Sequence, residues 1–233
     1  MRGHGLSDKP EPPYEWARFG DDLVALMRAM GLKAALGVGH SKGGYALVRA
    51  AALAPELFSG LLLVDPVILP REAYLEVRWS GEHFASRRRD AWSSPSEMFE
   101  AFCAREPFSR WQERVLRDYC GYGLGPNAAG VGYVLACPPR VEAAVYQAAV
   151  GGGDIYDEIA RVDVPVRVLR ARPRDPTAAM DMTSSPTAPD LAARCLHCTD
   201  GPAPQFSHFI PMEAPGVVAR ELRALELQVD ARA

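Results

Sequence analysis

The spacing of apolar residues changes several times along the chain, and each spacing predicts a different helix or strand. They recur at helical spacing between residues 16 and 30, which predicts a helix that ends at Gly31. A short apolar run over residues 34–38 predicts a buried strand, and a second helix is expected over residues 45–53. A further apolar run over residues 61–64 predicts the next strand. Strand, helix and strand at this spacing are typical of a βαβ unit, so the two strands are expected to be parallel.

The middle of the chain has a different pattern. Residues 71–150 are rich in arginine, glutamate and aromatic side chains and favour helices, with an interruption by glycine and proline at residues 121–132. We interpret this segment as a helical lid inserted into an α/β core made of residues 1–70 and 151–233. Its aromatic residues, expected to form mainly the core of the insertion, are Trp79, Phe84, Trp92, Phe99, Phe102, Phe108 and Trp111.

The α/β pattern resumes after the insertion. Residues 164–170 predict a strand, and residues 195–198 a last short strand. The chain is expected to end in a helix over residues 215–227. The predicted fold class is therefore α/β, with a mostly parallel sheet flanked by helices.

Composition excludes several classes of protein. The 233 residues are 48% hydrophobic and carry a net charge of −3, which suits one domain with a core, or one domain with a small lid. No basic excess is present for a nucleic-acid partner, and no apolar run reaches the ~20 residues that span a membrane. Five cysteines and the lack of a signal-peptide pattern at the start favour a reduced, cytoplasmic setting.

The turn between the first strand and the second helix carries the strongest chemical signal. Residues 39–43 read GHSKG and fit the G-x-S-x-G pattern of a strained turn that presents a nucleophilic serine. Ser41 is the candidate nucleophile, and the backbone N–H of Lys42 is the candidate donor to an oxyanion. We expect positions 39 and 43 to require small residues, because larger side chains would collide with the neighbouring backbone.

Two alternatives remain for this turn. Gly37, Gly39 and Gly43 also resemble a dinucleotide fingerprint, with Asp65 at the end of the next strand as a ribose-binding acid, although the glycine spacing is one residue too long. The second alternative is a tight glycine turn without chemistry.

A serine nucleophile needs a base and an orienting acid. Of the five histidines, His208 lies between the last strand and the last helix, where the order nucleophile, acid, histidine places the base. Asp65 is the favoured acid, with Asp175 as the alternative and Asp181 behind both. His208 and Asp65 also have ordinary structural interpretations, as a loop histidine and a strand-end carboxylate that bind local backbone groups.

Cys195 and Cys198 form a C-x-x-C pair with His197 between them. Structural zinc requires four ligands and no second pair occurs at a suitable spacing, so packing is the favoured interpretation. We expect neither a metal nor a cofactor.

Four stretches together resemble the α/β-hydrolase superfamily: RGHGLS at residues 2–7, GHSKGG at 39–44, LVDP at 63–66 and SHF at 207–209. The resemblance extends across nearly the whole chain. It implies a mostly parallel sheet flanked by helices, a lid after the strand that ends at Asp65, and a Ser-acid-His triad. It also implies that the acid follows that strand in some members.

The chain departs from the family at its start. In the family about four strands precede the RGHGLS-like loop, and a second oxyanion N–H comes from a His-Gly loop among them. We therefore expect an N-terminally truncated fold, with three alternatives: Met1 is internal to a longer protein, the gene model is truncated, or the chain has lost catalysis. One oxyanion donor contributes roughly 3–4 kcal/mol to transition-state stabilisation.

The expected function is a lidded serine hydrolase that acts on a small or medium apolar ester, or on a related acyl or C–C substrate, through an acyl-enzyme. The alternative is a catalytically inactive small-molecule binder or fragment of the same fold, and a nucleotide-binding oxidoreductase is a third hypothesis. The expected partner is a small-molecule substrate, without nucleic acid or membrane, and the sequence does not indicate an oligomeric state.

Overall fold

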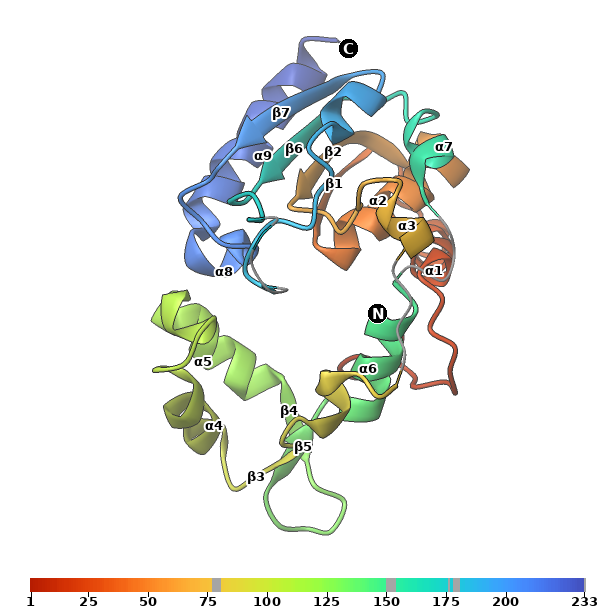
Figure 1. The fold of residues 1–233 in the computed structure, drawn as a ribbon. Coiled ribbons are helices and arrows are strands. Elements are labelled where there is room, and N and C mark those ends of the chain that lie inside the picture. Colours follow the sequence, from red (N-terminus) through yellow and green to blue (C-terminus); the bar gives the residue numbers. More distant parts are fainter. Residues whose placement is uncertain (77–80, 150–153, 176, 178–180, 233) are drawn as a thin grey trace. The chain divides into compact units, whose positions relative to one another are not determined.

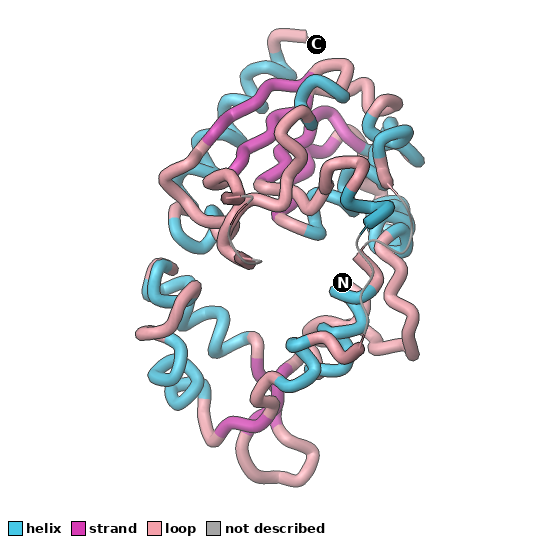
Figure 2. Tube along the Cα trace, in the orientation of Figure 1, coloured by secondary structure: helices cyan, strands magenta, loops and turns pink. Residues whose placement is uncertain are grey.

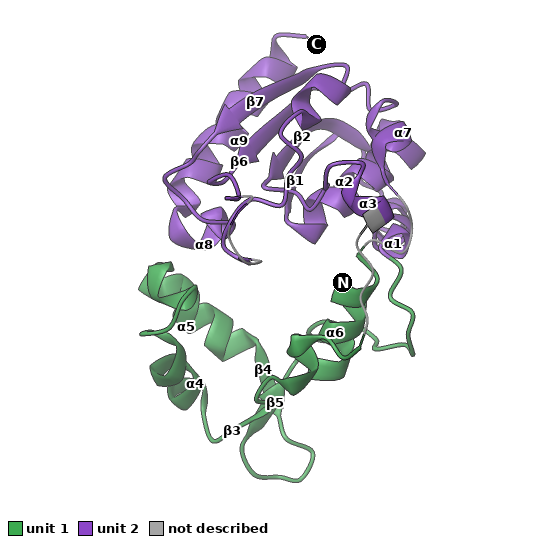
Figure 3. Ribbon diagram, in the orientation of Figure 1, with its two compact units in different colours: residues 1–15, 78–151 green, residues 16–77, 152–233 purple. Residues whose placement is uncertain are grey.

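The computed structural model describes residues 1–76, 81–149, 154–175, 177 and 181–232. The chain divides into two compact units (Figure 3). Unit 1 is Met1–Glu15 with Arg78–Gly151, and unit 2 is Trp16–Val77 with Gly152–Ala233. Trp79 and the expected boundary between residues 150 and 151 lie outside the described residues, and the assignment of residues 71–150 as a lid stays a prediction.

Unit 2 is built on a parallel sheet with the strand order β1-β2-β6-β7 (Figure 1). Its strands are β1 Ala35–His40, β2 Phe58–Val64, β6 Val166–Arg170 and β7 Cys198–Pro202. Each neighbouring pair is parallel, which confirms the βαβ prediction. Because parallel strands start at the same edge, the ends of β1 and β2 meet side by side, with His40 in register with Val64.

Helices cover both faces of this sheet. They are α1 Ala17–Ala29, α2 Lys42–Leu53, α3 Ala73–Glu76, α7 Tyr156–Ile159, α8 Ile210–Glu213 and α9 Pro215–Asp230, with the 3₁₀ turns Pro55–Leu57 and Leu191–Arg194. Alternate residues of β2 face opposite layers: Leu62 and Val64 join a buried cluster with Leu225 of α9, and Leu61 lies on the side of α2. Leu61 to Val64 are fully buried, as a continuous apolar run in a central parallel strand requires.

Unit 1 contains helices and a small antiparallel sheet. The helices are α4 Pro95–Phe102, α5 Glu113–Tyr122 and α6 Pro139–Gln147, with the 3₁₀ turns Phe84–Arg87 and Phe108–Arg110. The strands, magenta in Figure 2, are β3 Ala91–Trp92, β4 Leu124–Pro126 and β5 Tyr133–Leu135. Their order in the sheet is β3-β5-β4. The expected helices are confirmed, but the sheet is not predicted by the sequence because its strands have only two or three residues each.

Aromatic rings pack against one another inside unit 1. Phe102 stacks on Phe108 with ring centroids 4.3 Å apart, and the edge of Trp111 meets Phe108 at 4.9 Å. Trp92 meets Phe102 edge-on at 5.5 Å. Such pairs are individually favourable, so these rings act as core residues of unit 1. Phe84, in contrast, is half exposed.

The end of the chain shows one wrong prediction. The last strand starts at Cys198, in register with Val166, and runs to Pro202 instead of spanning residues 195–198. The 3₁₀ turn Leu191–Arg194 occupies the preceding segment, and Cys195 is the extended residue that ends it. Within the described residues, no helix has the length and apolar character needed to cross a membrane.

Candidate active site

The loop between β1 and α2 holds Ser41 in a conformation that L-residues rarely adopt. Its φ is 57° and its ψ is −125°, and its backbone N–H donates to Val64 O at 3.1 Å. A non-glycine residue at positive φ is strained and persists where the surrounding structure holds it in place. The turn therefore presents the Ser41 side chain at the carboxyl edge of the parallel sheet.

Glycines around Ser41 explain why this turn can close. A Cβ on Gly39 would lie 2.5 Å from Gly43 O, so no larger residue fits there. A Cβ on Gly43 would meet no atom of the described residues within 4 Å, whereas one on Gly44 would lie 2.6 Å from Pro66 Cβ. The expected collision at Gly39 is confirmed and the one at Gly43 is wrong, because the close approach on the helix side occurs at Gly44.

Gly39 and Gly43 form a matched pair for mutagenesis. Gly39→Ala is expected to lower the free energy of unfolding by about 2–3 kcal/mol, because the new methyl group overpacks the turn. Gly43→Ala is expected to raise it by up to about 1 kcal/mol, since alanine replaces glycine near the start of a helix with room for the methyl group. Urea denaturation measures both, and the opposite ranking would contradict the described turn.

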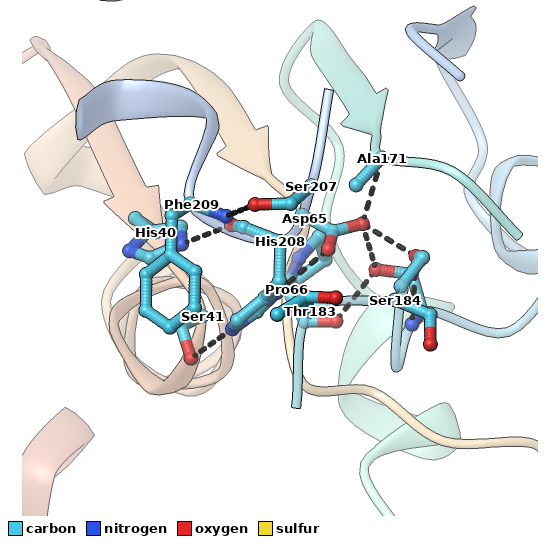
Figure 4. Close-up of polar contacts among 12 residues, drawn as sticks. His40, Ser41, Asp65, Pro66, Ala171, Thr183, Ser184, Ser207, His208 and Phe209 are labelled. Atoms are coloured by element: carbon cyan, nitrogen blue, oxygen red, sulfur yellow. Dashed lines mark hydrogen bonds and ion pairs between the residues drawn. The ribbon is translucent and has the colours of Figure 1, made fainter. Parts of the chain in front are cut away.

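His208 lies between Ser41 and Asp65 (Figure 4). Its Nδ1 is 2.7 Å from Asp65 Oδ2, and its Nε2 is 3.0 Å from Ser41 Oγ. Because an ionised carboxylate only accepts hydrogen bonds, Nδ1 carries the proton and Nε2 accepts from the Ser41 hydroxyl. The three predicted side chains, from three segments far apart in sequence, thus form one hydrogen-bonded line.

Asp65 is fully buried at the end of β2, with φ 43°. Its Oδ1 accepts hydrogen bonds from Ala171 N at 3.0 Å and Ser185 Oγ at 2.5 Å, while Oδ2 faces His208. Thr187 Oγ1 is 3.2 Å from Oδ1 and 2.7 Å from Pro66 O. These contacts compensate the buried carboxylate for lost water and fix its orientation. They also leave both oxygens engaged within the protein, which disfavours the ribose-binding interpretation of Asp65.

The hydrogen bond from Ser185 is expected to support the fold as well as the site. Ser185→Ala removes a donor to a buried charge and should lower the free energy of unfolding by about 1.5–3 kcal/mol at pH 7. Thr199→Val is the matched control, because its hydroxyl donates to the neutral Val166 O at 3.4 Å. Equal losses in the two variants, measured by urea denaturation, would show that Ser185 does not stabilise a carboxylate.

The other candidate residues have different environments. Asp175 Oδ1 accepts from Thr177 N at 2.8 Å, and Asp181 accepts from Thr183 and Ser184 and pairs with Arg172. Hydrogen bonds from the loop and the Arg172 charge outweigh burial and lower the pKa of Asp181 to about 2. Of the three aspartates considered, Asp65 is the one the structure places against His208.

The remaining histidines bind local groups. His4 Nδ1 is 3.0 Å from Arg2 O, His83 stacks on Tyr146, and His197 Nε2 is 3.1 Å from Asp163 Oδ1. His4 and His83 belong to unit 1.

His40 is a site residue that the sequence analysis did not assign. Its Nε2–H donates to His208 O at 2.7 Å, and the two rings lie 4.9 Å apart (Figure 4). Strand alternation provides the reason: Leu36 packs on the α9 side of the sheet, so His40, four residues on, points to the same side, where the His208 loop lies. The two-residue alternation of side chains along the predicted strand could therefore have indicated the direction of the His40 side chain.

Burial, and then the neighbouring His208, lower the pKa of His40 to about 4. The native state thus binds a proton less readily than the unfolded chain, and stability should fall as the pH drops from about 6.5 towards 4. We expect His40 to account for about 1–2 kcal/mol of stability lost between pH 7 and pH 5. His40→Gln keeps an N–H donor but does not titrate, so its urea-denaturation profile should lack this part of the slope. Parallel slopes in both proteins would contradict the environment described for His40.

Lys42 begins α2, so its backbone N–H lies at the positive end of the helix dipole beside Ser41. Its ammonium lies 3.9 Å from the centre of the Phe19 ring in α1, a cation–π contact. Among the described residues, no group of three or more histidine, cysteine or acidic side chains is arranged to hold a metal ion.

The comparisons with known proteins agree with this fold. A family model described as the alpha/beta hydrolase fold matches residues 1–102. The crystal structure of an E-2-(acetamidomethylene)succinate hydrolase aligns with a TM-score of 0.71 at 24% identity, covering 99% of this chain and 79% of that one. Residues 1–102 therefore match the α/β-hydrolase family model, and the chain has the α/β-hydrolase fold. It has the parallel sheet flanked by helices that this α/β-hydrolase fold implies.

Two sequence relatives and one more solved structure define the extent of similarity. A 2-(acetamidomethylene)succinate hydrolase from Mesorhizobium japonicum is 45% identical over 65 residues, 28% of this chain and 23% of that protein. A non-heme chloroperoxidase from Streptomyces lividans is 27% identical over 72% of this chain and 59% of its own length. An esterase from Mycobacterium tuberculosis aligns with a TM-score of 0.69 at 21% identity, over 97% of this chain and 72% of its own. The matched sequence therefore spans less than two thirds of both sequence relatives.

Proposed function

We propose that this α/β-hydrolase chain is a serine hydrolase in which Ser41 is the nucleophile, His208 the base and Asp65 the orienting acid. The observation that carries the proposal is the continuous hydrogen-bonded line from Ser41 Oγ through the His208 ring to Asp65 Oδ2, with distances of 3.0 and 2.7 Å. Catalytic serines need this arrangement because a free hydroxyl is a poor nucleophile until a positioned base accepts its proton.

In the first half of the reaction, Ser41 Oγ attacks the carbonyl carbon while His208 Nε2 takes the hydroxyl proton. Asp65 stabilises the resulting imidazolium through its contact with Nδ1 and remains ionised. The Lys42 N–H stabilises the oxyanion. Collapse of the tetrahedral intermediate breaks the bond to the leaving group, which receives the proton from Nε2, and leaves an acyl group on Ser41.

In the second half, His208 Nε2 removes a proton from water as the water oxygen attacks the acyl carbon. The ester bond to Ser41 then breaks, and the serine oxygen recovers the proton from Nε2. The acid product leaves, and the line of hydrogen bonds is restored. His40, which holds the His208 backbone carbonyl, acts as a positioning residue throughout.

We propose a small or medium apolar ester, or a related acyl or C–C substrate, as the substrate class. The names of the related proteins, which include a hydrolase and a putative esterase from Haemophilus influenzae, support acyl hydrolysis in general. Hydrolysis of p-nitrophenyl acetate and p-nitrophenyl butyrate tests the proposal. We expect turnover of both, with a rapid initial release of p-nitrophenol as the acyl-enzyme forms.

The alternative is an inactive binder with the same fold. A binder would be stabilised thermally by a non-hydrolysable analogue of the ester but would release no p-nitrophenol above the rate of His208→Ala. Turnover that depends on His208 excludes the binder, and folded protein without such turnover overturns the hydrolase proposal.

A further inference from the structure

The C-x-x-C pair is a motif of the sequence that the proposed hydrolase site does not use. Cys195 ends the 3₁₀ turn Leu191–Arg194, and Cys198 is the first residue of β7. Residues 196–197 form a turn, and the two cysteines lie at its ends. We propose that Cys195 and Cys198 are a reactive dithiol that a small-molecule disulfide, such as oxidised glutathione, converts into an intramolecular disulfide.

The backbone brings the two cysteines close together. Cys198 is in register with Val166 of β6, and the neighbouring His197 O accepts from Val166 N at 2.9 Å, so this end of the pair is fixed to the sheet. Cys195 N lies 3.4 Å from Ala192 O as the 3₁₀ turn closes. The turn at residues 196–197 brings the Cα atoms of the two cysteines to within about 7 Å, close to the range that a disulfide spans, so a disulfide requires little rearrangement of the backbone.

The pair is open to small reagents. Both cysteines are half-buried, and Leu196 between them is largely exposed. β7 is the outer strand of the four-stranded sheet in the described part of the chain, next to β6 alone. The His197 ring is directed to Asp163, and among the described residues no third ligand completes a metal site with the two sulfurs. The geometry thus favours thiol–disulfide chemistry over metal binding.

The two thiols differ in how readily they ionise. The neighbouring Cys198 lowers the pKa of Cys195 despite burial, whereas Cys195, burial and the nearby Asp200 raise the pKa of Cys198. Thr199 O, 3.9 Å from Cys198 Sγ, accepts the Cys198 proton. Because the thiolate is the attacking species, Cys195 is the expected nucleophile and Cys198 the resolving thiol.

The exchange balances in two steps. The Cys195 thiolate attacks one sulfur of oxidised glutathione, forms a mixed disulfide and releases one glutathione thiolate. The Cys198 thiolate then attacks Cys195 Sγ, closes the internal disulfide and releases the second glutathione. The protein loses two electrons and two protons, and the oxidised glutathione becomes two reduced molecules. No atom of Ser41, His208 or Asp65 takes part, so this inference is independent of the proposed function.

Peptide mapping tests the proposal directly. Trypsin cuts after Arg194 and Arg220, so residues 195–220 form one peptide that contains Cys195 and Cys198 and no other cysteine. Reduced, full-length protein is incubated with oxidised glutathione, alkylated under denaturing conditions and digested. We expect this peptide to lose two hydrogens and to escape alkylation. A peptide with both cysteines alkylated, or with a stable glutathione adduct, would overturn the proposal.

Two variants and one reagent separate the roles of the thiols. In Cys198→Ser the reaction should stop at the glutathione adduct on Cys195. Cys195→Ser should react with oxidised glutathione at least tenfold more slowly than wild type. Cys103→Ser, at an exposed cysteine of unit 1, is the control and should behave like wild type. Phenylarsine oxide, whose arsenic bridges two nearby sulfurs, should bind wild type but neither single variant. If a variant fails to fold, the peptide map and the arsenical binding of the wild-type protein still test whether the two thiols form a disulfide. Equal arsenical binding by wild type and both single variants would contradict a dithiol made of Cys195 and Cys198.

Discussion

Replacing Ser41 by alanine is expected to lower kcat for p-nitrophenyl acetate by about 10⁵- to 10⁶-fold while leaving the fold intact. In the proposed mechanism the hydroxyl forms the acyl-enzyme, and the loss of a nucleophile that acts together with its base removes most of the catalysis of such a unit. The turn should be retained in Ser41→Ala, because Gly39 and Gly44 still permit the close approaches that build it.

Ser109→Ala is the control for this prediction. Ser109 is an exposed serine in the 3₁₀ turn Phe108–Arg110 of unit 1 and should leave kcat within a factor of two of wild type, as an order-of-magnitude expectation for a surface substitution. Circular dichroism and urea denaturation verify that both variants fold. Activity in Ser41→Ala within tenfold of wild type would show that another group is the nucleophile.

Asp65→Asn is expected to lower kcat by about 10⁴-fold. An asparagine can turn its amide N–H₂ towards His208, which favours the tautomer with the proton on Nε2 and so removes the acceptor for the Ser41 hydroxyl. It also removes the charge that stabilises the imidazolium. The substitution keeps the volume of the side chain, so the change reports on charge and hydrogen bonding more than on packing.

Asp175→Asn and Asp181→Asn decide between the candidate acids. Asp175 binds Thr177, and Asp181 binds its own loop and Arg172, so neither change should lower kcat by more than about threefold. A 10⁴-fold loss in Asp175→Asn together with an active Asp65→Asn would reassign the acid to the loop after β6.

The sequence predicted the parts of the site that depend on local chain geometry. The apolar runs that become β1 and β2 and the glycine turn between them locate Ser41, and chain order together with the position before α9 locates His208. Asp65 was favoured over Asp175 because it ends β2, and its register with the end of β6, where Asp65 N donates to Leu169 O at 2.7 Å, places its carboxylate beside the His208 loop.

Features set by contacts between distant segments were harder to predict. Ser185 and Thr187 lie in a loop rich in proline, serine and threonine, in which many hydroxyls look alike, and their contacts with Asp65 join positions 120 and 122 residues apart. The small sheet of unit 1 was not predicted, because strands of two or three residues are too short to show an alternation of apolar and polar residues. The expected collision at Gly43 was wrong because the contact of α2 with Pro66, which only the packed structure shows, falls one residue later.

Mass spectrometry of a phosphonylated peptide tests the central claim most directly. Trypsin cuts after Lys33 and Lys42, which gives the peptide of residues 34–42, AALGVGHSK, where Ser41 is the single hydroxyl. After reaction of the native protein with a fluorophosphonate, we predict one adduct per chain, located on Ser41 by fragmentation and absent from denatured protein and from His208→Ala. An unmodified peptide 34–42 in folded, fluorophosphonate-treated protein, or an adduct on another residue, would contradict the assignment of Ser41 as the nucleophile.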